Sequence, residues 1–178
     1  MPKFQLKYLN LRGKAEPIRL ILHYMEQPFE DVRENFLEFA KYKDSLEPET
    51  DEERATCECL AERIQDYMSF IRPYINCLLG IIPAEKLPTL SERVFMPCIT
   101  RDYAPIFEHQ LQKCNTGYLV GDSLTWIDFY AACFSDYALT YGKPDIFEKF
   151  PRVQYHCRAI LSLPQLQEYL KSRVDTLC

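Results

Sequence analysis

The 178-residue chain lacks several features that mark large classes of proteins. Its five glycines are scattered, so it has no glycine-rich loop of the kind that cradles a phosphate group. It has three histidines, with neither a His-Glu-x-x-His motif nor a paired-cysteine spacing, which disfavours a metal enzyme. The sequence therefore predicts neither a bound metal nor a phosphate-binding enzyme.

Long apolar runs and basic clusters are also missing. No stretch approaches the roughly 20 apolar residues that a membrane span needs, and the longest, residues 77–83, contains a glycine. The N-terminus has no apolar core of a signal peptide. Lys and Arg number 21 against 26 Asp and Glu, and a net charge of −5 would repel a nucleic-acid backbone. We therefore expect a cytoplasmic protein that binds neither membranes nor nucleic acid.

What the chain does have is enough apolar material for a folded core. Hydrophobic residues make up 47% of the sequence and aromatic residues 13%, which excludes wholesale disorder. Eight cysteines are present, but they form no Cys-x-x-Cys pair and no secretory signal accompanies them. We interpret them as small buried apolar side chains that stay reduced.

The N-terminal part has the pattern of a small α/β unit. Residues 3–9 alternate between apolar and polar side chains, which predicts a strand. A turn containing Gly13 follows, and Pro17 suits the first turn of the next helix. Residues 29–33 predict a second strand, and residues 35–43 a short second helix. A helical crossover of this length predicts that the two strands pair in parallel.

The rest of the chain has helical periodicity. Residues 47–53 are acidic and contain a proline, which indicates a linker. Thr50 and Glu53 then form a capping box that opens a long amphipathic helix, and Pro73 predicts a kink in it. The apolar stripe of this helix consists of Leu60, Ile64, Met68, Ile71, Ile75 and Leu78.

Further helices follow. The spacing of Thr89 and Glu92 predicts the start of one helix, which we expect to bend or break at Pro97 and Pro105. From Thr125 to the end, the pattern predicts short helices separated by prolines.

A second capping box involves Thr125 and Asp128. We expect the Asp128 carboxylate to reach back to the amide of Thr125, with Leu124 and Phe129 in the staple positions on either side. Loss of this carboxylate should cost on the order of 1 kcal/mol or more. The face of the helix that we expect to be buried comprises Trp126, Phe129, Tyr130, Cys133 and Tyr137.

Two segments resemble a known family. Residues 8–19, Tyr-Leu-Asn-Leu-Arg-Gly-Lys-Ala-Glu-Pro-Ile-Arg, are similar to the opening of sigma-class cytosolic glutathione S-transferases of the hematopoietic prostaglandin D synthase type. Residues 121–128, Gly-Asp-Ser-Leu-Thr-Trp-Ile-Asp, resemble the helix-capping motif of that family. The resemblance implies a truncated, thioredoxin-like, glutathione-binding domain in residues 1–45 and an all-α transferase domain in residues 46–178.

The resemblance implies glutathione as the co-substrate and Tyr8 as the catalytic residue. A free thiol has a pKa near 8.5, so little thiolate exists at neutral pH. A phenol that donates a hydrogen bond to the sulfur favours the thiolate and lowers that pKa. The implied reaction is nucleophilic addition of glutathione to small apolar electrophiles in detoxification, or a related isomerisation such as prostaglandin D synthesis. The alternation alone favours a purely structural interpretation, in which Tyr8 is an aromatic residue of an amphipathic strand, and the resemblance reverses this preference.

The resemblance also assigns the remaining binding residues. Phe39 stands where the family has a tryptophan that contacts glutathione, and Lys43 matches a lysine that pairs with the glycine carboxylate. Asp66 matches an acid that reaches the glutamyl amine of glutathione bound by the partner subunit. Lys14, which replaces an arginine, and Met68 are assigned to the electrophile pocket. Without the resemblance, Lys43 and Asp66 are exposed helix charges.

One segment of the family is missing from this sequence. After its second helix the family has two strands and a helix, which with their loops amount to roughly thirty residues. These residues normally pair with the cysteinyl backbone of glutathione and hold its glutamyl carboxylate. The sequence therefore leaves two hypotheses: a glutathione transferase with weak or absent activity, or a non-catalytic relative or splice variant that binds apolar ligands or a partner. The resemblance implies a homodimer, which we expect to be weakened by the same loss.

Overall fold

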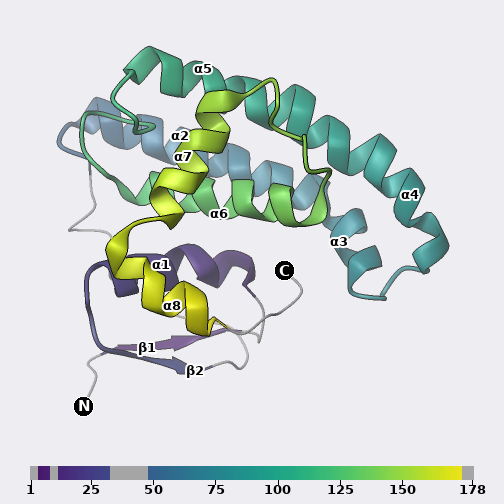
Figure 1. The fold of residues 1–178 in the computed structure, drawn as a ribbon, viewed down its shortest axis with the longest axis horizontal. Helices are drawn as coiled ribbons and strands as arrows, with labels where there is room; N and C mark the ends of the chain where they lie inside the picture. Colours follow the sequence, from purple (N-terminus) through teal and green to yellow (C-terminus); the bar gives the residue numbers. More distant parts are fainter. Residues whose placement is uncertain (1–3, 9–11, 33–47, 174–178) are drawn as a thin grey trace.

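The computed structural model describes residues 4–8, 12–32 and 48–173. In Figure 1, two short strands and helix α1 lie at one end, and the remaining helices lie beside and above them. This arrangement is the predicted fold class, a thioredoxin-like α/β part followed by a helical part. The predicted helix over residues 35–43 lies outside the described residues.

The two strands form a parallel pair joined by a helical crossover, as the sequence predicts. Strand β1 (Phe4–Lys7) pairs with β2 (Phe29–Val32), with Phe4 opposite Phe29. A 3-10 turn (Gly13–Ala15) leads from β1 into helix α1 (Glu16–Tyr24). Pro17 lies in the first turn of this helix. A backbone N–H at this position would have no acceptor within the helix, so proline costs no hydrogen bond there.

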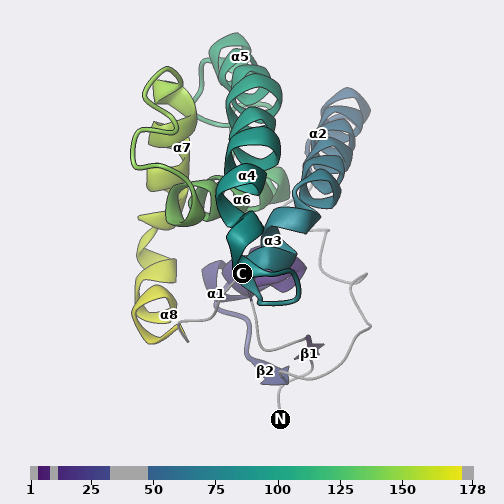
Figure 2. The same cartoon turned by 90° about the vertical axis from the view of Figure 1, so that its right-hand side faces the viewer.

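The helical part is organised around helix α6, which packs against α1, α2 and α7 (Figures 1 and 2). None of the helices in the described ranges combines the length and the apolar character that crossing a bilayer requires. The elements are α2 (Asp51–Phe70), α3 (Arg72–Leu78), a 3-10 turn (Ala84–Lys86), α4 (Leu87–Leu90), two π-helical turns (Ser91–Phe95 and Cys98–Tyr103), α5 (Ala104–Cys114), α6 (Trp126–Tyr141), α7 (Pro151–Leu161), a further 3-10 turn (Pro164–Leu166) and α8 (Gln167–Ser172).

The capping box and the kink predicted for the long helix are both present. The backbone N–H of Glu53 donates to Oγ1 of Thr50 over 3.2 Å, and the Thr50 N–H donates to Oε2 of Glu53 over 3.1 Å. The helix is interrupted at Ile71, two residues before Pro73, and divides there into α2 and α3. The predicted apolar stripe faces the core: Leu60, Ile64 and Ile71 are buried, and Met68, Ile75 and Leu78 pack against them.

The start predicted at Thr89 is wrong, and of the bend or break predicted at Pro97 and Pro105 the break does not occur. The helical run begins at Ala84, with no side-chain cap at its first turn, and continues to Cys114. The two π-helical turns lie beside the prolines, and their wider hydrogen-bond spacing lets the chain pass residues that lack a backbone donor.

Helix α1 shares a hydrophobic cluster with the helical part. Leu20 of α1 is fully buried against side chains of α6, α7 and the C-terminal segment. The crossover helix is therefore anchored on a second surface besides its own two-stranded sheet, which by itself would be marginally stable. The buried members of the cluster are Leu20, Phe129, Ala132, Ile160, Leu166 and Tyr169.

Candidate functional site

Tyr8 is held at the end of β1 by two backbone contacts. Its N–H donates to the carbonyl of Val32 over 2.9 Å, which extends the strand pairing by one residue. Its phenol oxygen accepts a hydrogen bond from the backbone N–H of Lys14 over 3.1 Å. Gly13, with φ of +41°, makes the turn that carries this N–H. A phenol that accepts a hydrogen bond through its oxygen can still donate its own proton, and such a donor is what a thiolate requires.

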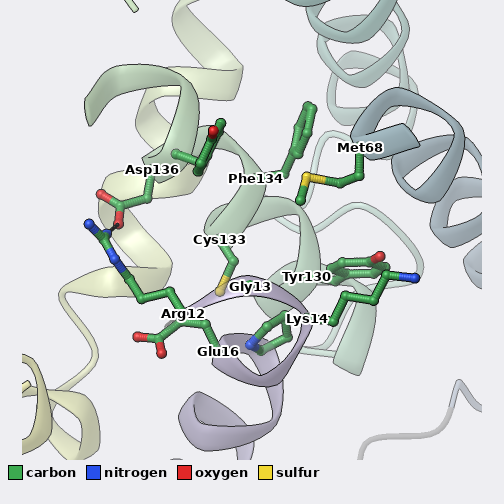
Figure 3. A pocket seen from close by; sticks show the side chains of 11 residues that line it. Arg12, Gly13, Lys14, Glu16, Met68, Tyr130, Cys133, Phe134 and Asp136 are labelled. Atoms are coloured by element: carbon green, nitrogen blue, oxygen red, sulfur yellow. Dashed lines mark hydrogen bonds and ion pairs between the residues drawn. The ribbon is translucent and has the colours of Figure 1, made fainter. Parts of the chain in front are cut away.

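A small pocket lies where this turn meets α2 and α6 (Figure 3). Lys14 and Met68, the two residues assigned to the electrophile pocket, both line it, although they are far apart in the sequence. Tyr8 does not line it but is joined to it through Lys14. The lining residues are Arg12, Gly13, Lys14, Glu16, Pro17, Met68, Tyr130, Cys133, Phe134, Asp136 and Tyr137.

One wall of the pocket is built on a buried ion-pair network around Glu16. Nη1 of Arg19, a fully buried residue, lies 3.4 Å from the Glu16 carboxylate, and its Nε lies 3.2 Å from Asp31. Glu16 also accepts hydrogen bonds of 2.9 Å from the Tyr169 hydroxyl and from Arg173. Burial and the nearby Glu16 charge raise the pKa of Tyr169, which keeps this phenol protonated as a donor.

The network continues onto helix α6. Asp136 lies 3.1 Å from Nη1 of Arg12 and 3.6 Å from Nη2 of Arg173. Arg173 therefore bridges the two pocket carboxylates, Glu16 and Asp136. The two acids on this wall are both neutralised by arginines, and the pairs join the turn before α1, helix α6 and the end of α8.

Two residues of α6 place weak acids at the pocket. Burial, with smaller contributions from Cys133 and Tyr8, raises the pKa of Tyr130 to about 12. Burial also raises the pKa of the Cys133 thiol well above its ordinary value. Both groups stay protonated at neutral pH, so Cys133 is not a thiolate nucleophile and Tyr130 is a hydrogen-bond donor.

Of the other predicted glutathione contacts, the structure describes only Asp66. Asp66 is exposed on α2 and does not line the pocket. Phe39 and Lys43 lie outside the described residues. No group of three or more His, Cys, Asp or Glu side chains in the described ranges could hold a metal ion.

Sequence reasoning missed most of the pocket wall that α6 supplies. It assigned Tyr130, Cys133 and Tyr137 to a buried core face, because aromatic and small apolar side chains at helical spacing usually pack in a core. The available signal was Asp136, an acid three residues after Cys133 and one before Tyr137. A charged residue at the edge of an apolar helix face indicates that this edge meets either solvent or a partner charge.

Comparisons with known proteins agree with the fold. Residues 83–173 match the glutathione S-transferase C-terminal domain. Over 209 aligned positions, which cover 99% of both proteins, the chain is 30% identical to probable glutathione S-transferase 5 of Caenorhabditis elegans. The chain belongs to the glutathione S-transferase family.

Two further relatives support this assignment. Human hematopoietic prostaglandin D synthase is 26% identical over an alignment that covers 99% of each chain. A solved glutathione S-transferase of the hookworm Necator americanus, described as monomeric, superimposes with a TM-score of 0.83 and is 28% identical, covering 97% of this chain and 98% of its own. Transferases of this family use glutathione as co-substrate.

Proposed function

We propose that this transferase adds the thiolate of glutathione to apolar electrophiles, with Tyr8 donating a hydrogen bond to the sulfur. The observation that carries the proposal is the hydrogen bond from the Lys14 N–H to the Tyr8 oxygen. It turns the phenol toward the same loop that lines the pocket, so the thiolate and the electrophile would meet there. We further propose that the enzyme is of the sigma class, acts in detoxification and is cytoplasmic. The alternative reaction on the same thiolate is an isomerisation of the kind named for its prostaglandin D synthase relative.

The glutathione site itself is proposed to be incomplete. The alignment with the nematode relative has 209 positions, whereas this chain has 178 residues. At least 31 alignment positions are therefore gaps in this chain. This supports an N-terminal domain that ends at residue 45, without the family's last two strands and helix. Tyr8, Phe39 and Lys43 would then remain to hold glutathione, together with Asp66 of the partner subunit. Losing two or three anchoring hydrogen bonds at about 1–3 kcal/mol each would weaken glutathione binding by a factor of hundreds or more.

The proposal is tested with a conjugation assay that uses 1-chloro-2,4-dinitrobenzene and millimolar glutathione. We expect turnover well below that of an ordinary enzyme, because a weakly held thiol is rarely positioned beside Tyr8. Tyr8→Phe should lower the remaining rate about tenfold, which corresponds to one unit of thiol pKa. Tyr155→Phe, which removes the hydroxyl of an exposed tyrosine of α7 away from this pocket, is the matched control and should leave the rate unchanged.

A non-catalytic, ligand-binding role is the second candidate. The pocket lining favours this role, because the lining residues come from the turn before α1, from α2 and from α6. None of these segments belongs to the part that is proposed to be missing, so the pocket can bind apolar ligands without glutathione. A residual conjugation rate that Tyr8→Phe does not change, with apolar ligands still bound, would favour this role over catalysis.

We also propose that the chain forms a homodimer that is weaker than the family's stable one. The strand and helix proposed to be missing would supply part of such a contact, and among the described strands β1 pairs only with β2. A strand edge that no neighbour covers recruits other strands. Sedimentation over a hundredfold dilution from micromolar protein should show dissociation. A single tight dimer throughout the dilution would mean that the helical part carries the interface alone.

A further inference from the structure

A second pocket lies between the C-terminal end of α5 and the first turns of α7. Helix α7 begins beside α5, at the end of the molecule away from the two strands (Figures 1 and 2). The pocket has a volume of about 300 Å³, within the range of small-molecule sites, and shares no lining residue with the pocket beside Tyr8. Its lining includes Leu111, Asn115, Pro151, Arg152, Tyr155 and His156.

Arg152 gives this second pocket a positive charge. Of the Lys, Arg, Asp and Glu residues in the described chain, Arg152 alone lines it. Its Nη1 lies 3.5 Å from Oδ1 of Asn115, and it makes no ion pair with a described residue. The Glu108 carboxylate instead accepts the backbone N–H groups of Arg152 and Val153, over 3.3 and 3.0 Å, where the helix dipole of α7 is positive. The Arg152 guanidinium therefore remains for an anionic group of a ligand.

His156 adds a buried hydrogen-bonding group to the same pocket. Its side chain is 3% exposed, and its Nε2 lies 2.9 Å from the Asp128 carboxylate. A carboxylate only accepts hydrogen bonds, so Nε2 is the donor, and in the neutral ring Nδ1 is then an acceptor. Nδ1 has no hydrogen-bond partner among the residues that the structure describes. An N–H or O–H group of a ligand can pair with it.

Aromatic and apolar side chains complete the lining. Arg152, Tyr155 and His156 are three and four residues apart on α7, so they lie on one face of the helix. Tyr155 is 71% exposed, which leaves most of its ring free for contact. Leu111 and Pro151 are the apolar lining residues. This combination suits a ligand with an aromatic body and polar groups at its ends.

We propose that this second pocket binds small aromatic monocarboxylates that carry a ring hydroxyl or N–H group. The carboxylate pairs with the Arg152 guanidinium, the ring contacts Tyr155, and the hydroxyl or N–H donates to Nδ1 of His156. A dianion such as a phosphate is disfavoured, because its second charge would have no partner in the lining. The inference goes beyond the proposed function, since none of these residues lines the pocket beside Tyr8.

The two polar contacts can each be removed from the ligand without changing the protein. 4-Hydroxybenzoate carries a carboxylate and a hydroxyl at opposite positions of its ring, and Arg152 and His156 are one helical turn apart. Benzoate lacks the hydroxyl that would donate to His156. 4-Hydroxybenzamide keeps the hydroxyl but lacks the charge that would pair with Arg152. The three compounds therefore separate the two contacts.

The test is calorimetric titration of the whole chain with these three compounds at pH 7, without glutathione. We expect 4-hydroxybenzoate to bind about tenfold more tightly than 4-hydroxybenzamide, the factor for one charge-assisted hydrogen bond, and about fivefold more tightly than benzoate. Arg152→Gln should abolish the preference for the acid over the amide and keep the preference for the hydroxyl. Tyr155→Ala should weaken the binding of all three compounds severalfold.

Arg158→Gln is the matched control, because it removes an exposed arginine of the same helix that does not line the pocket, and it should keep both preferences. Arg152 is itself exposed, so Arg152→Gln should fold normally, and its melting temperature checks this.

Three results would each overturn the inference. They are no binding of 4-hydroxybenzoate, benzoate or the amide binding as tightly as 4-hydroxybenzoate, and a preference for the acid that survives Arg152→Gln, which would place the ligand elsewhere. Because binding is measured without glutathione and away from Tyr8, a protein that fails to conjugate 1-chloro-2,4-dinitrobenzene but shows both preferences would support this inference and refute only the proposed catalysis.

Discussion

Replacing Asp128 by alanine is expected to lower the free energy of unfolding by about 3–5 kcal/mol, the range for removing one partner of a buried charged network. The Asp128 carboxylate is fully buried and accepts hydrogen bonds of 2.9 Å from the backbone N–H groups of Leu119 and Thr125. Nε2 of the buried His156 lies 2.9 Å from the same carboxylate. Asp128 thus ties the preceding loop, the start of α6 and helix α7 together, and Asp128→Ala leaves all these groups without their acceptor.

Urea denaturation of the two proteins measures the loss. Glu53→Ala is the matched control, because it removes the equivalent carboxylate of the capping box of α2, which is closer to solvent and receives the Thr50 N–H. We expect it to cost about 1 kcal/mol, an ordinary value for a cap. A similar small loss for both variants would mean that Asp128 acts only as a helix cap, and that its bonds to Leu119 and His156 contribute little to stability.

Replacing Glu16 by alanine should be about as damaging, with an expected loss of 3–5 kcal/mol. Glu16 is 3% exposed and is one of the carboxylates that neutralise the fully buried Arg19. The variant also removes the acceptor of Tyr169 and Arg173, which come from the C-terminal segment. Because 1 kcal/mol shifts the melting temperature of a chain of this size by about 2–4 °C, the melting temperature should fall by about 10 °C.

Two further variants separate the charge of Glu16 from its hydrogen bonds. Tyr169→Phe removes one donor to Glu16 and keeps the ion pairs, so we expect a loss of only about 1–2 kcal/mol. Glu16→Gln keeps an acceptor for Tyr169 but leaves Arg19 with one carboxylate fewer, and its loss should approach that of the alanine variant. A glutamine variant as stable as the unchanged chain would show that the network is held by hydrogen bonds and shape instead of charge.

Local patterns in the sequence predicted most helix starts and strands correctly. The Thr50–Glu53 box, the reach of Asp128 to the Thr125 amide and the parallel pairing of β1 with β2 are all present. Each depends on residues that are close in the chain or on a single periodicity, so the sequence carries the information directly. The start predicted at Thr89 was wrong because a capping pattern also occurs inside a helix, where neighbouring turns already satisfy its backbone donors.

The sequence by itself determined the family, the order of the elements and the position of Tyr8 at the end of the first strand. Only the tertiary structure decided what surrounds that tyrosine. The hydrogen bond from the Lys14 N–H to Tyr8 and the meeting of Lys14 with Met68 and Tyr130 in one pocket both depend on how the segments pack. The same holds for the neutralisation of Glu16 by Arg173, 157 residues away. No periodicity encodes such pairs, because they depend on how α1 docks against α6 and α8, and that docking is set by the shape of the whole core.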